Sequence, residues 1–272
     1  MKRMAVWLTM AMLAFSSCAA AQTLSVAFYD VGKADAILIT TPEGYRILID
    51  AAKNKEGKKL AERLQKEGVE RIDSMIITHY DKDHVGGADQ ILENFEVGTV
   101  YMPVYDKESK QHTQFLEALK KHPPETVDEM RIRSEIITET PDGATLRIST
   151  AHENFYGSDE ENDFSLAVRM TYGDTKFLFA GDAESARQLE LLSEGDVTCD
   201  VLKVPHHGKF EKSSPAFLTE ASPKIAFISD DEKEPAERAV VQILEELGAK
   251  VHCARDGGDL IVFSDGKNVF AE

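Results

Sequence analysis

Apolar and polar positions follow two different spacings in the first part of the chain. Short apolar runs bounded by turn residues indicate strands, and the stretch after them changes to helical spacing that stops at Gly68. Three strands followed by one helix predict a meandering antiparallel edge of a sheet. The expected strands are 24–29, 36–40 and 45–50, and the expected helix is 55–67.

The rest of the chain alternates strands and helices without a low-complexity linker. This order predicts two sheets packed face to face with helices outside, in a single domain over residues 22–272. Further strands are expected at 73–78, 99–102, two within 130–148, 165–171, 176–180, 201–204, 224–228, 251–253, 260–263 and 268–270. Further helices are expected at 85–94, 109–121, 183–192, 215–219 and 235–247.

Residues 1–21 have the pattern of a secretory signal: a basic start, an apolar stretch too short to cross a bilayer, and a small-residue end. Ala19 to Ala21 fits ordinary signal cleavage. Phe15 to Cys18 resembles a bacterial lipobox, which would tether the chain to the membrane through a lipid on Cys18, and this second interpretation is preferred. We therefore expect an exported protein without a transmembrane span in its mature form, in the bacterial cell envelope as a lipoprotein, in the periplasm or outside the cell.

Composition narrows the class of protein. Apolar residues make up 42% and charged residues 29% of the chain, a globular balance that argues against disorder. The formal net charge of −17 repels polyanions at long range, so nucleic acid is a disfavoured but open partner. Cys199 and Cys253 lie in apolar runs where buried free thiols are common, and a disulfide between them stays open.

The stretch that carries the most chemistry follows the apolar run 74–77. A buried strand that delivers imidazoles and carboxylates into a loop suits divalent cations, since imidazole binds zinc and similar metals and carboxylates can terminate or bridge. A solvated polar loop is the alternative, but two His and two Asp in this register are unusual for one. The four side chains are His79, Asp81, Asp83 and His84.

Further candidate ligands follow other expected strands. Asp50, Asp182 and the pair His206 and His207 each come at a strand end, so they converge on the first motif if the sheets align. Plainer interpretations exist, because Asp182 could cap a helix and the His pair could form a polar turn. His152 is the weakest candidate, since a lone loop histidine is commonly solvated.

These motifs together resemble the metallo-β-lactamase superfamily and, within it, the ComEC/Rec2-like hydrolase subgroup. The H-x-D-x-D-H motif with its two glycines carries the family resemblance, and the other motifs occur in the order of the subgroup. The resemblance extends from Leu24 to the C-terminus and implies an α/β fold, the four-layer αββα sandwich, with the site at one edge of both sheets. The motifs are Asp30–Ala36, His79–Gly87, Asn162–Leu166, Phe179–Ala183 and Leu202–Gly208.

The resemblance also implies a dinuclear site for Zn²⁺ or Mn²⁺ that presents a metal-bound hydroxide to a phosphoester. The implied ligands are His79, Asp81 and His152 for one ion, Asp83 and His84 for the other, and Asp182 between them. The implied catalytic residues are Asp83, His206 and His207, where the histidines face the substrate, protonate a leaving group or, for one of them, bind metal. The implied supporting residues are Asp50, which orients a ligand, and Asp35 and Asn162 at the rim.

One departure from the family concerns the second ion. The family often has a late His directly before a Pro, where this chain has Glu234 and Pro235. Glu234, or Asp230 or Asp231 nearby, is expected to act as an oxygen ligand instead, which would favour a harder metal such as Mn²⁺. The alternative is a weak second site.

Two classes of function follow. The first is an exported metallohydrolase acting on a small or polymeric phosphoester, such as a phosphocholine-type headgroup or nucleic acid. The second is a non-catalytic or weakly active metal-binding surface module with a degenerate second site. A β-lactamase is a poorer third choice, because Asp81 occupies the second ligand position of the motif, where a His would be expected.

Overall fold

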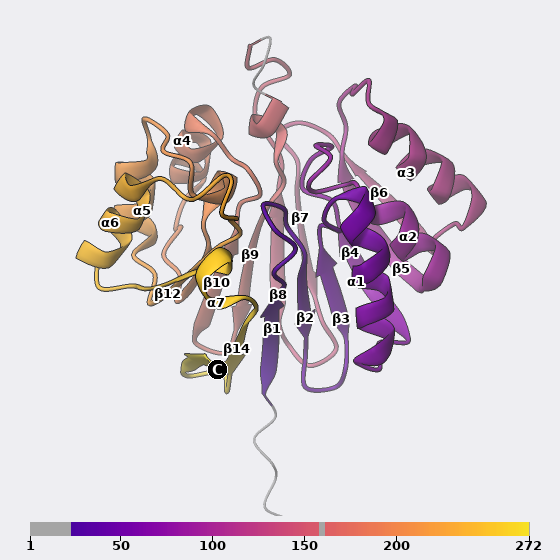
Figure 1. Cartoon of the computed structure of the whole chain (residues 1–272), viewed down its shortest axis with the longest axis horizontal. Coiled ribbons are helices and arrows are strands. Elements are labelled where there is room, and N and C mark those ends of the chain that lie inside the picture. Colours follow the sequence, from indigo (N-terminus) through magenta and orange to yellow (C-terminus); the bar gives the residue numbers. More distant parts are fainter. Residues whose placement is uncertain (1–22, 158–160, 272) are drawn as a thin grey trace, which may run out of the picture.

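A computed structural model describes residues 23–157 and 161–271. The predicted signal segment and Cys18 lie outside the described residues. Two β-sheets form the centre, and helices cover the outer face of each (Figure 1). Helices α1, α2 and α3 pack on the first sheet and α4, α5 and α6 on the second, so the expected αββα sandwich is confirmed.

The first sheet has the strand order β15-β14-β1-β2-β3-β4-β5-β6, and the second has the order β13-β12-β11-β10-β9-β8-β7. The strands are β1 (Leu24–Phe28), β2 (Ile37–Thr40), β3 (Arg46–Ile49), β4 (Arg71–Ile76), β5 (Glu96–Pro103), β6 (Thr126–Met130), β7 (Glu135–Glu139), β8 (Thr145–Ser149), β9 (Ala167–Tyr172), β10 (Thr175–Phe179), β11 (Val201–Lys203), β12 (Ile225–Ile228), β13 (Lys250–Cys253), β14 (Leu260–Ser264) and β15 (Val269–Ala271). The helices are α1 (Asn54–Lys66), α2 (Ala88–Asn94), α3 (Lys110–Lys121), α4 (Ser185–Glu194), α5 (Ser214–Ala221), α6 (Arg238–Glu246) and α7 (Ala254–Gly257), with 3₁₀ turns η1 (Glu161–Phe164) and η2 (Pro205–Gly208).

The expected antiparallel meander is present as β1, β2 and β3, but its place at a sheet edge is wrong, because β14 pairs with β1 on one side and β4 with β3 on the other. Strands β3 to β6 run parallel. In the second sheet β10, β11 and β12 are also parallel. The carboxyl ends of these parallel strands carry Asp50, the His79 loop, Asp182 and the His206 turn. The topology therefore places the predicted ligands at strand ends of both sheets.

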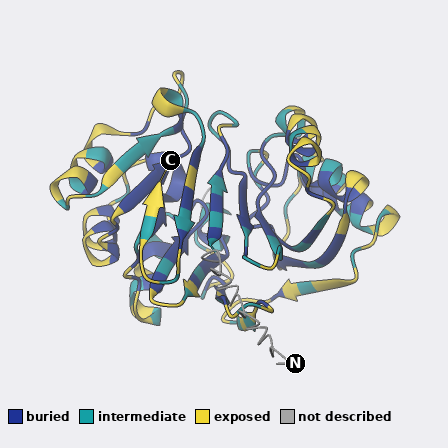
Figure 2. Ribbon diagram, turned by 90° about the horizontal axis from the view of Figure 1, so that it is seen from below, coloured by how far each residue is buried: buried dark blue, intermediate teal, exposed yellow. Residues whose placement is uncertain are grey.

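An apolar layer joins the two sheets, and Figure 2 shows the buried strands between helices whose outer surfaces are exposed. In this layer Phe28 of the first sheet stacks on Phe227 of the second, with ring centroids 4.8 Å apart. Cys199 is buried and Cys253 half-buried. Both are free thiols, so no disulfide joins them. Among the helices of the described ranges, none has the length and apolar character needed to cross a bilayer.

Several elements differ from the sequence-based expectation, among them the short helix α7 and the 3₁₀ turns, which were not expected, strand β6 and the start of helix α6. Strand β6 was not predicted, because it is an exposed edge strand in which only Met130 is buried, so it has no apolar pattern. Helix α6 begins at Arg238, later than expected. Preceding amides are bonded to carboxylates instead: Glu234 N donates to Asp231 Oδ1 at 2.8 Å and Ala236 N to Asp230 Oδ2 at 2.9 Å.

Candidate metal centre

The loop after β4 is held by its own backbone and by its neighbours. His84 N and Val85 N donate to Asp81 O at 3.0 and 2.9 Å, and Asp35 N donates to Asp83 O at 3.0 Å. Close packing requires glycine at position 87, because a Cβ atom on Gly87 would lie 2.2 Å from Ala51 O. The ligand-bearing loop is therefore set rigidly between α1 and α2.

The two histidines of this loop are fully buried, with ring centroids 4.1 Å apart. Asp50 supports one of them: its Oδ2 lies 2.7 Å from His84 Nδ1 and also accepts from Thr78 Oγ1 at 2.7 Å. Asp50 Oδ2 can only accept, so His84 Nδ1 carries a proton. Burial would lower the pKa of His84, but Asp182, Asp50 and Asp35 outweigh it and raise that pKa well above its ordinary value, so a metal ion would replace a proton on Nε2, which lies 3.2 Å from Asp182 Oδ1. The orienting contact predicted for Asp50 is present.

The second sheet supplies Asp182 through a tight turn. Gly181 has φ +53°, and a Cβ atom there would lie 2.9 Å from Thr78 Cβ and from Ser165 Oγ, so only glycine fits. Asp182 N donates to Ser165 Oγ at 3.1 Å. Helix α4 has Glu184 at its N-cap, so the interpretation of Asp182 as a helix cap is wrong and its carboxylate faces the histidines instead.

His207 also enters this cluster. Its Nε2 lies 3.1 Å from Asp182 Oδ2 and 3.8 Å from Asp83 Oδ2, and its Nδ1 donates to Ser229 O at 2.9 Å. His206 and His207 both have positive φ, 49° and 52°, a conformation that costs energy in residues with a side chain. This strained turn directs the two neighbouring imidazoles to different partners.

The inward atoms of the cluster have no hydrogen-bond partner among the described residues, although they are buried. They are His79 Nε2, His84 Nε2, His207 Nε2 and Asp182 Oδ1. Buried polar atoms normally find partners, and imidazole nitrogens beside carboxylates are the atoms that divalent metals bind. Three candidate sets share His84, each with ligand atoms within 4.8 Å of one another: His79, His84 and Asp182; Asp83, His84 and His207; and Asp35, Asp50 and His84. The first two contain the inward atoms named above. The residues present therefore fit a pair of divalent ions.

Charges around the cluster agree with metal binding. Burial lowers the pKa of His79 to about 4, so its imidazole is neutral and its lone pair is available. Burial alone would raise the pKa of Asp182, but His207, His84 and Lys203 outweigh it and hold that pKa well below its ordinary value. Asp182 is therefore a carboxylate.

Lys203 is a member of the site that sequence reasoning missed. Its buried ammonium contacts the Asp35 carboxylate, lies 3.5 Å from Asp182 Oδ1 and donates to Gly181 O at 3.2 Å. Burial opposes its charge, but Asp35 and Asp182 together raise the pKa of Lys203 above its ordinary value. The lysine is a fixed positive charge that offsets part of the carboxylate excess. The sequence feature that could have identified Lys203 is the presence of a lysine inside the apolar run 201–204.

The substitutes expected for a late His are not at the cluster. Glu234 is an exposed side chain that pairs with Lys33 at 2.9 Å, and Asp231 binds backbone amides near it. Asp230 is buried but pairs with Arg255 at 2.9 Å. His207 lies instead beside Asp83 and His84, so the second set of ligands is complete without any of these acids.

The other predicted residues take different positions. Asp81 is partly exposed and its Oδ1 accepts from Lys107 Nζ at 2.9 Å. His152 lies outside the ligand sets found in the described part of the chain, because its Nε2 contacts Glu194 Oε1 at 3.1 Å. Asn162 Nδ2 donates to Glu184 Oε1 at 2.9 Å and lies 3.4 Å from His206 Nε2.

His206 forms a separate group beside the main cluster. Its Nδ1 lies 3.3 Å from Glu184 Oε1 and 3.6 Å from Glu211 Oε1, although neither contact has hydrogen-bond geometry. Burial lowers the pKa of His206 to about 4, so the imidazole is neutral. The acids Glu184 and Glu211 were not singled out from the sequence, because each lies in an ordinary polar stretch.

Comparison with protein families matches residues 29–229 to the metallo-β-lactamase superfamily. The chain belongs to this superfamily. The two sheets, and the candidate ligands at the ends of their strands, are therefore those of a metallo-β-lactamase domain.

Three curated relatives confirm the ComEC/Rec2-like resemblance of this metallo-β-lactamase domain. ComE operon protein 3 of Bacillus subtilis is 24% identical over 248 residues, covering 82% of this chain and 30% of the relative. Recombination protein 2 of Haemophilus influenzae is 26% identical over 230 residues, covering 83% of this chain and 26% of the relative. Competence protein ComA of Neisseria gonorrhoeae is 23% identical over 207 residues, covering 75% and 27%. The chain thus spans less than a third of the length of these relatives.

Solved structures share the fold. Igni18, a metallo hydrolase from Ignicoccus hospitalis, has a TM-score of 0.55 at 15% identity, covering 88% of this chain and 98% of that one. CmlA, a diiron β-hydroxylase from Streptomyces venezuelae, has a TM-score of 0.58 at 14% identity, covering 87% and 53%. Because these two proteins have different chemistries, the metallo-β-lactamase fold does not by itself determine the reaction.

Proposed function

We propose that this chain is an exported metal-dependent hydrolase that cleaves a phosphoester. The observation that carries the proposal is the set of buried imidazole and carboxylate atoms that face one another without hydrogen-bond partners among the described residues. His79, Asp81 and Asp182 would hold one ion, and Asp83, His84, His207 and Asp182 the other. Zn²⁺ and Mn²⁺ both suit this mixed nitrogen and oxygen set.

When bound, such a pair of ions supplies a nucleophile at neutral pH and neutralises charge on an anionic substrate. The residues of the chain prepare the site for this. Asp50 keeps a proton on Nδ1 of His84, so that an ion binds at Nε2, and Ser229 does the same for His207. Lys203 adds a positive charge beside Asp182, which favours a substrate that carries negative charge.

His206 is a neutral imidazole at the rim of the site, because burial lowers its pKa to about 4. Glu184 lies on the Nδ1 side of the ring, and Asn162 lies 3.4 Å from Nε2. The contact with Glu184 lacks hydrogen-bond geometry, and Asn162 Nδ2 can donate to Nε2, so the neutral ring is placed to accept a proton rather than to supply one. The role of His207 is then that of a ligand, and His206 acts from the rim with Asn162.

The substrate is proposed to be a small phosphoester. The net charge of −17 works against a long polyanion, although bound cations would reduce this effect locally. A segment like 1–21 would export the chain, and a lipid on Cys18 would tether it to a membrane. Mass spectrometry of the mature N-terminus would separate lipidation at Cys18 from cleavage after Ala21.

A second candidate function is a metal-binding surface module without catalysis. The contact between Asp81 and Lys107 favours it, because a carboxylate already paired with an ammonium is a poorer ligand. Assays with Zn²⁺ or Mn²⁺ on a panel of phosphodiesters would decide between the two. We expect hydrolysis by the wild type and loss of about 10³-fold in His84→Ala, because several kcal/mol of transition-state stabilisation depend on the ions.

His122→Ala is the matched control, since this histidine follows α3 and belongs to none of the ligand sets. It should retain wild-type rates. Equal trace rates in wild type and His84→Ala would support the non-catalytic module instead.

A further inference from the structure

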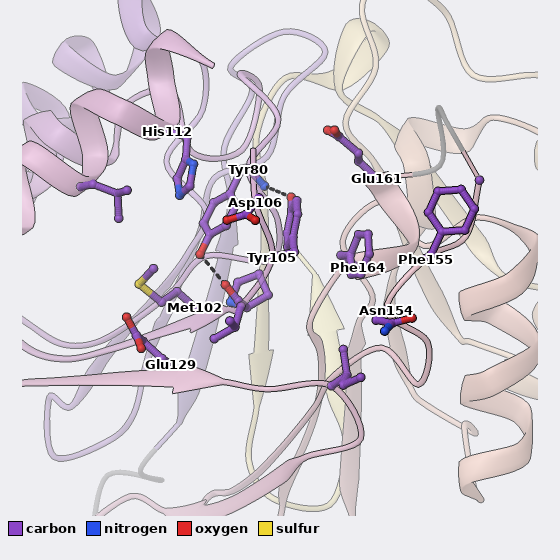
Figure 3. A pocket seen from close by; sticks show the side chains of 15 residues that line it. Tyr80, Met102, Tyr105, Asp106, His112, Glu129, Asn154, Phe155, Glu161 and Phe164 are labelled. Carbon is purple, nitrogen blue, oxygen red and sulfur yellow. Dashed lines mark hydrogen bonds between the residues drawn. The ribbon is translucent and has the colours of Figure 1, made fainter. Parts of the chain in front are cut away.

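A pocket of about 680 Å³ opens beside the metal loop, between the segment that follows β5 and the η1 turn (Figure 3). Its lining contains no member of the ligand cluster, but three links connect it to the proposed metal centre. Tyr80 lies between His79 and Asp81, Lys107 contacts both Asp81 and Glu161, and Phe164 precedes the serine that binds Asp182 N. The pocket therefore lies next to the Asp81 side of the proposed centre, and the proposal below places one part of a substrate in each.

The charges that line the pocket have one sign. Asp106, Glu129 and Glu161 all contribute carboxylates, and none of the described lining residues is Lys or Arg. Lys107, which follows Asp106 of the lining, already pairs with Asp81 and Glu161. The acidic lining disfavours a second phosphate or any other anion and favours a cation.

Aromatic side chains form the rest of the lining. Tyr80 and Tyr105 are tilted against each other with ring centroids 4.8 Å apart, and Tyr105 stacks on Phe164 at 4.5 Å. Burial raises the pKa values of both tyrosines above their ordinary range, so these rings are neutral. Figure 3 shows Phe155 near Phe164 on the wall opposite Tyr80. Rings beside carboxylates are the setting in which proteins bind organic ammonium groups.

Exposed apolar side chains gather at this pocket. Phe155 is 71% exposed, and Val104 and Ile132 of the same lining are also exposed. Large apolar side chains that remain in water together commonly mark a binding site. An alkylammonium group matches this lining, because its carbon surface would cover the apolar side chains while its charge meets the carboxylates.

We propose that this pocket binds an organic ammonium group carried by the substrate next to its phosphoester. The proposal rests on the phosphoesterase function above and narrows it to a zwitterionic substrate, with the phosphate at the metal centre and the ammonium in the pocket. A nucleobase, which is neutral and planar, is the competing occupant, and the test below includes it.

The test compares two esters that differ only in charge: p-nitrophenyl 2-(trimethylammonio)ethyl phosphate and p-nitrophenyl 3,3-dimethylbutyl phosphate. We expect kcat/KM to be at least about tenfold higher for the charged ester, in line with a desolvated cation–π contact assisted by carboxylates. Equal values, or a higher value for p-nitrophenyl thymidine 5′-phosphate, would overturn the proposal while leaving the phosphoesterase function intact.

A binding measurement separates the two claims further. Isothermal titration of the metal-free full chain with choline and with uncharged 3,3-dimethylbutan-1-ol should show tighter binding of choline. Binding of choline without hydrolysis of any ester would support the pocket and overturn the phosphoesterase function. Equal affinity for the two alcohols would overturn the pocket.

Variants test the named residues. Glu129→Gln and Phe155→Ala are both exposed changes, so folding should be retained, and each should narrow the charged-to-uncharged kcat/KM ratio by about threefold. Glu117→Gln on the exposed side of α3 is the matched control and should leave the ratio at its wild-type value. An unchanged ratio in both pocket variants would contradict the assignment.

Discussion

The Arg187 cluster and the cluster of His84 and Asp182 are both buried and both charged, but they differ in how their polar atoms are satisfied. Arg187 is fully buried, and its guanidinium donates to Ser165 O, to Ser149 and to the carboxylates of Glu190 and Glu194. These contacts use all five N–H groups of the side chain.

The cluster of His84 and Asp182 is different, because Nε2 of His84 and Oδ1 of Asp182 have no hydrogen-bond partner in the described structure. The lesson of the difference is that a buried charged cluster with complete hydrogen bonding stabilises the fold by itself. A cluster with inward atoms left over is built for something that is bound later.

Breaking the Arg187 cluster should have the largest effect on stability. Arg187→Met removes the guanidinium from the half-buried Glu190 and Glu194, of which only Glu194 keeps another arginine, Arg169 at 3.0 Å, so we expect the free energy of unfolding of the metal-free protein to fall by about 3 kcal/mol. Urea unfolding measures this. Arg133→Met is the control, because the Arg133 side chain is 66% exposed, and its change should stay within about 0.5 kcal/mol.

The metal cluster should instead stabilise the fold only when metal is present. At a free metal concentration of about 100 times the dissociation constant, the wild type should gain about 2.7 kcal/mol. Asp182→Asn should lose most of this gain, because it removes the carboxylate that lies 3.2 Å from His84 Nε2 and 3.1 Å from His207 Nε2. Urea unfolding with Zn²⁺ and with EDTA gives both values, and an equal gain in the variant would argue that the ion binds elsewhere.

A smaller effect is expected one contact away from the metal. Asp50→Asn keeps an oxygen that can accept from Thr78 but weakens the support of His84 Nδ1. Metal affinity should fall by about 10–100-fold, which competition with a chromogenic chelator would measure. Unaltered affinity would mean that Asp50 has only a structural role.

The smallest expected effect is the loss of the stability that Glu194 contributes as the pH falls. Burial raises the pKa of Glu194, but Arg187 outweighs burial and the net pKa lies below its ordinary value of 4.5. The stabilisation by ionised Glu194 is therefore fully present above about pH 4.5 and is lost as the pH falls through the lower, folded-state pKa. The stability gap between wild type and Glu194→Gln should thus shrink from pH 6 toward pH 3. Urea midpoints at each pH test this, and a gap that widens in acid would reverse the assignment.

Much of the metal site could be predicted because its ligands follow directly from local patterns. His79 to His84, Asp50 and Asp182 each come straight after a buried strand, so the strand prediction also placed the ligand. Their convergence then required only that strand ends of the two sheets meet. This is also why the αββα layers were predicted correctly although the exposed strand β6 was not.

The contributions of His207, Lys203 and His152 could not be read in this way. Whether His206 or His207 faces Asp182 depends on the left-handed backbone of both residues, and the sequence His-His does not predict this conformation. The partner of Lys203 is Asp35, 168 positions away on the other sheet, so the pairing depends on how the sheets pack. His152 has a partner in Glu194 that only the position of α4 brings within reach.

The measurement that tests the central claim most directly is the metal content of the purified chain after gel filtration into metal-free buffer. Elemental analysis should find about two divalent ions per wild-type chain and about one per chain in His207→Ala, since His207 belongs to only one of the two ligand sets. A wild type with one ion or none, or a His207→Ala variant with the wild-type content, would contradict a dinuclear centre that includes this histidine.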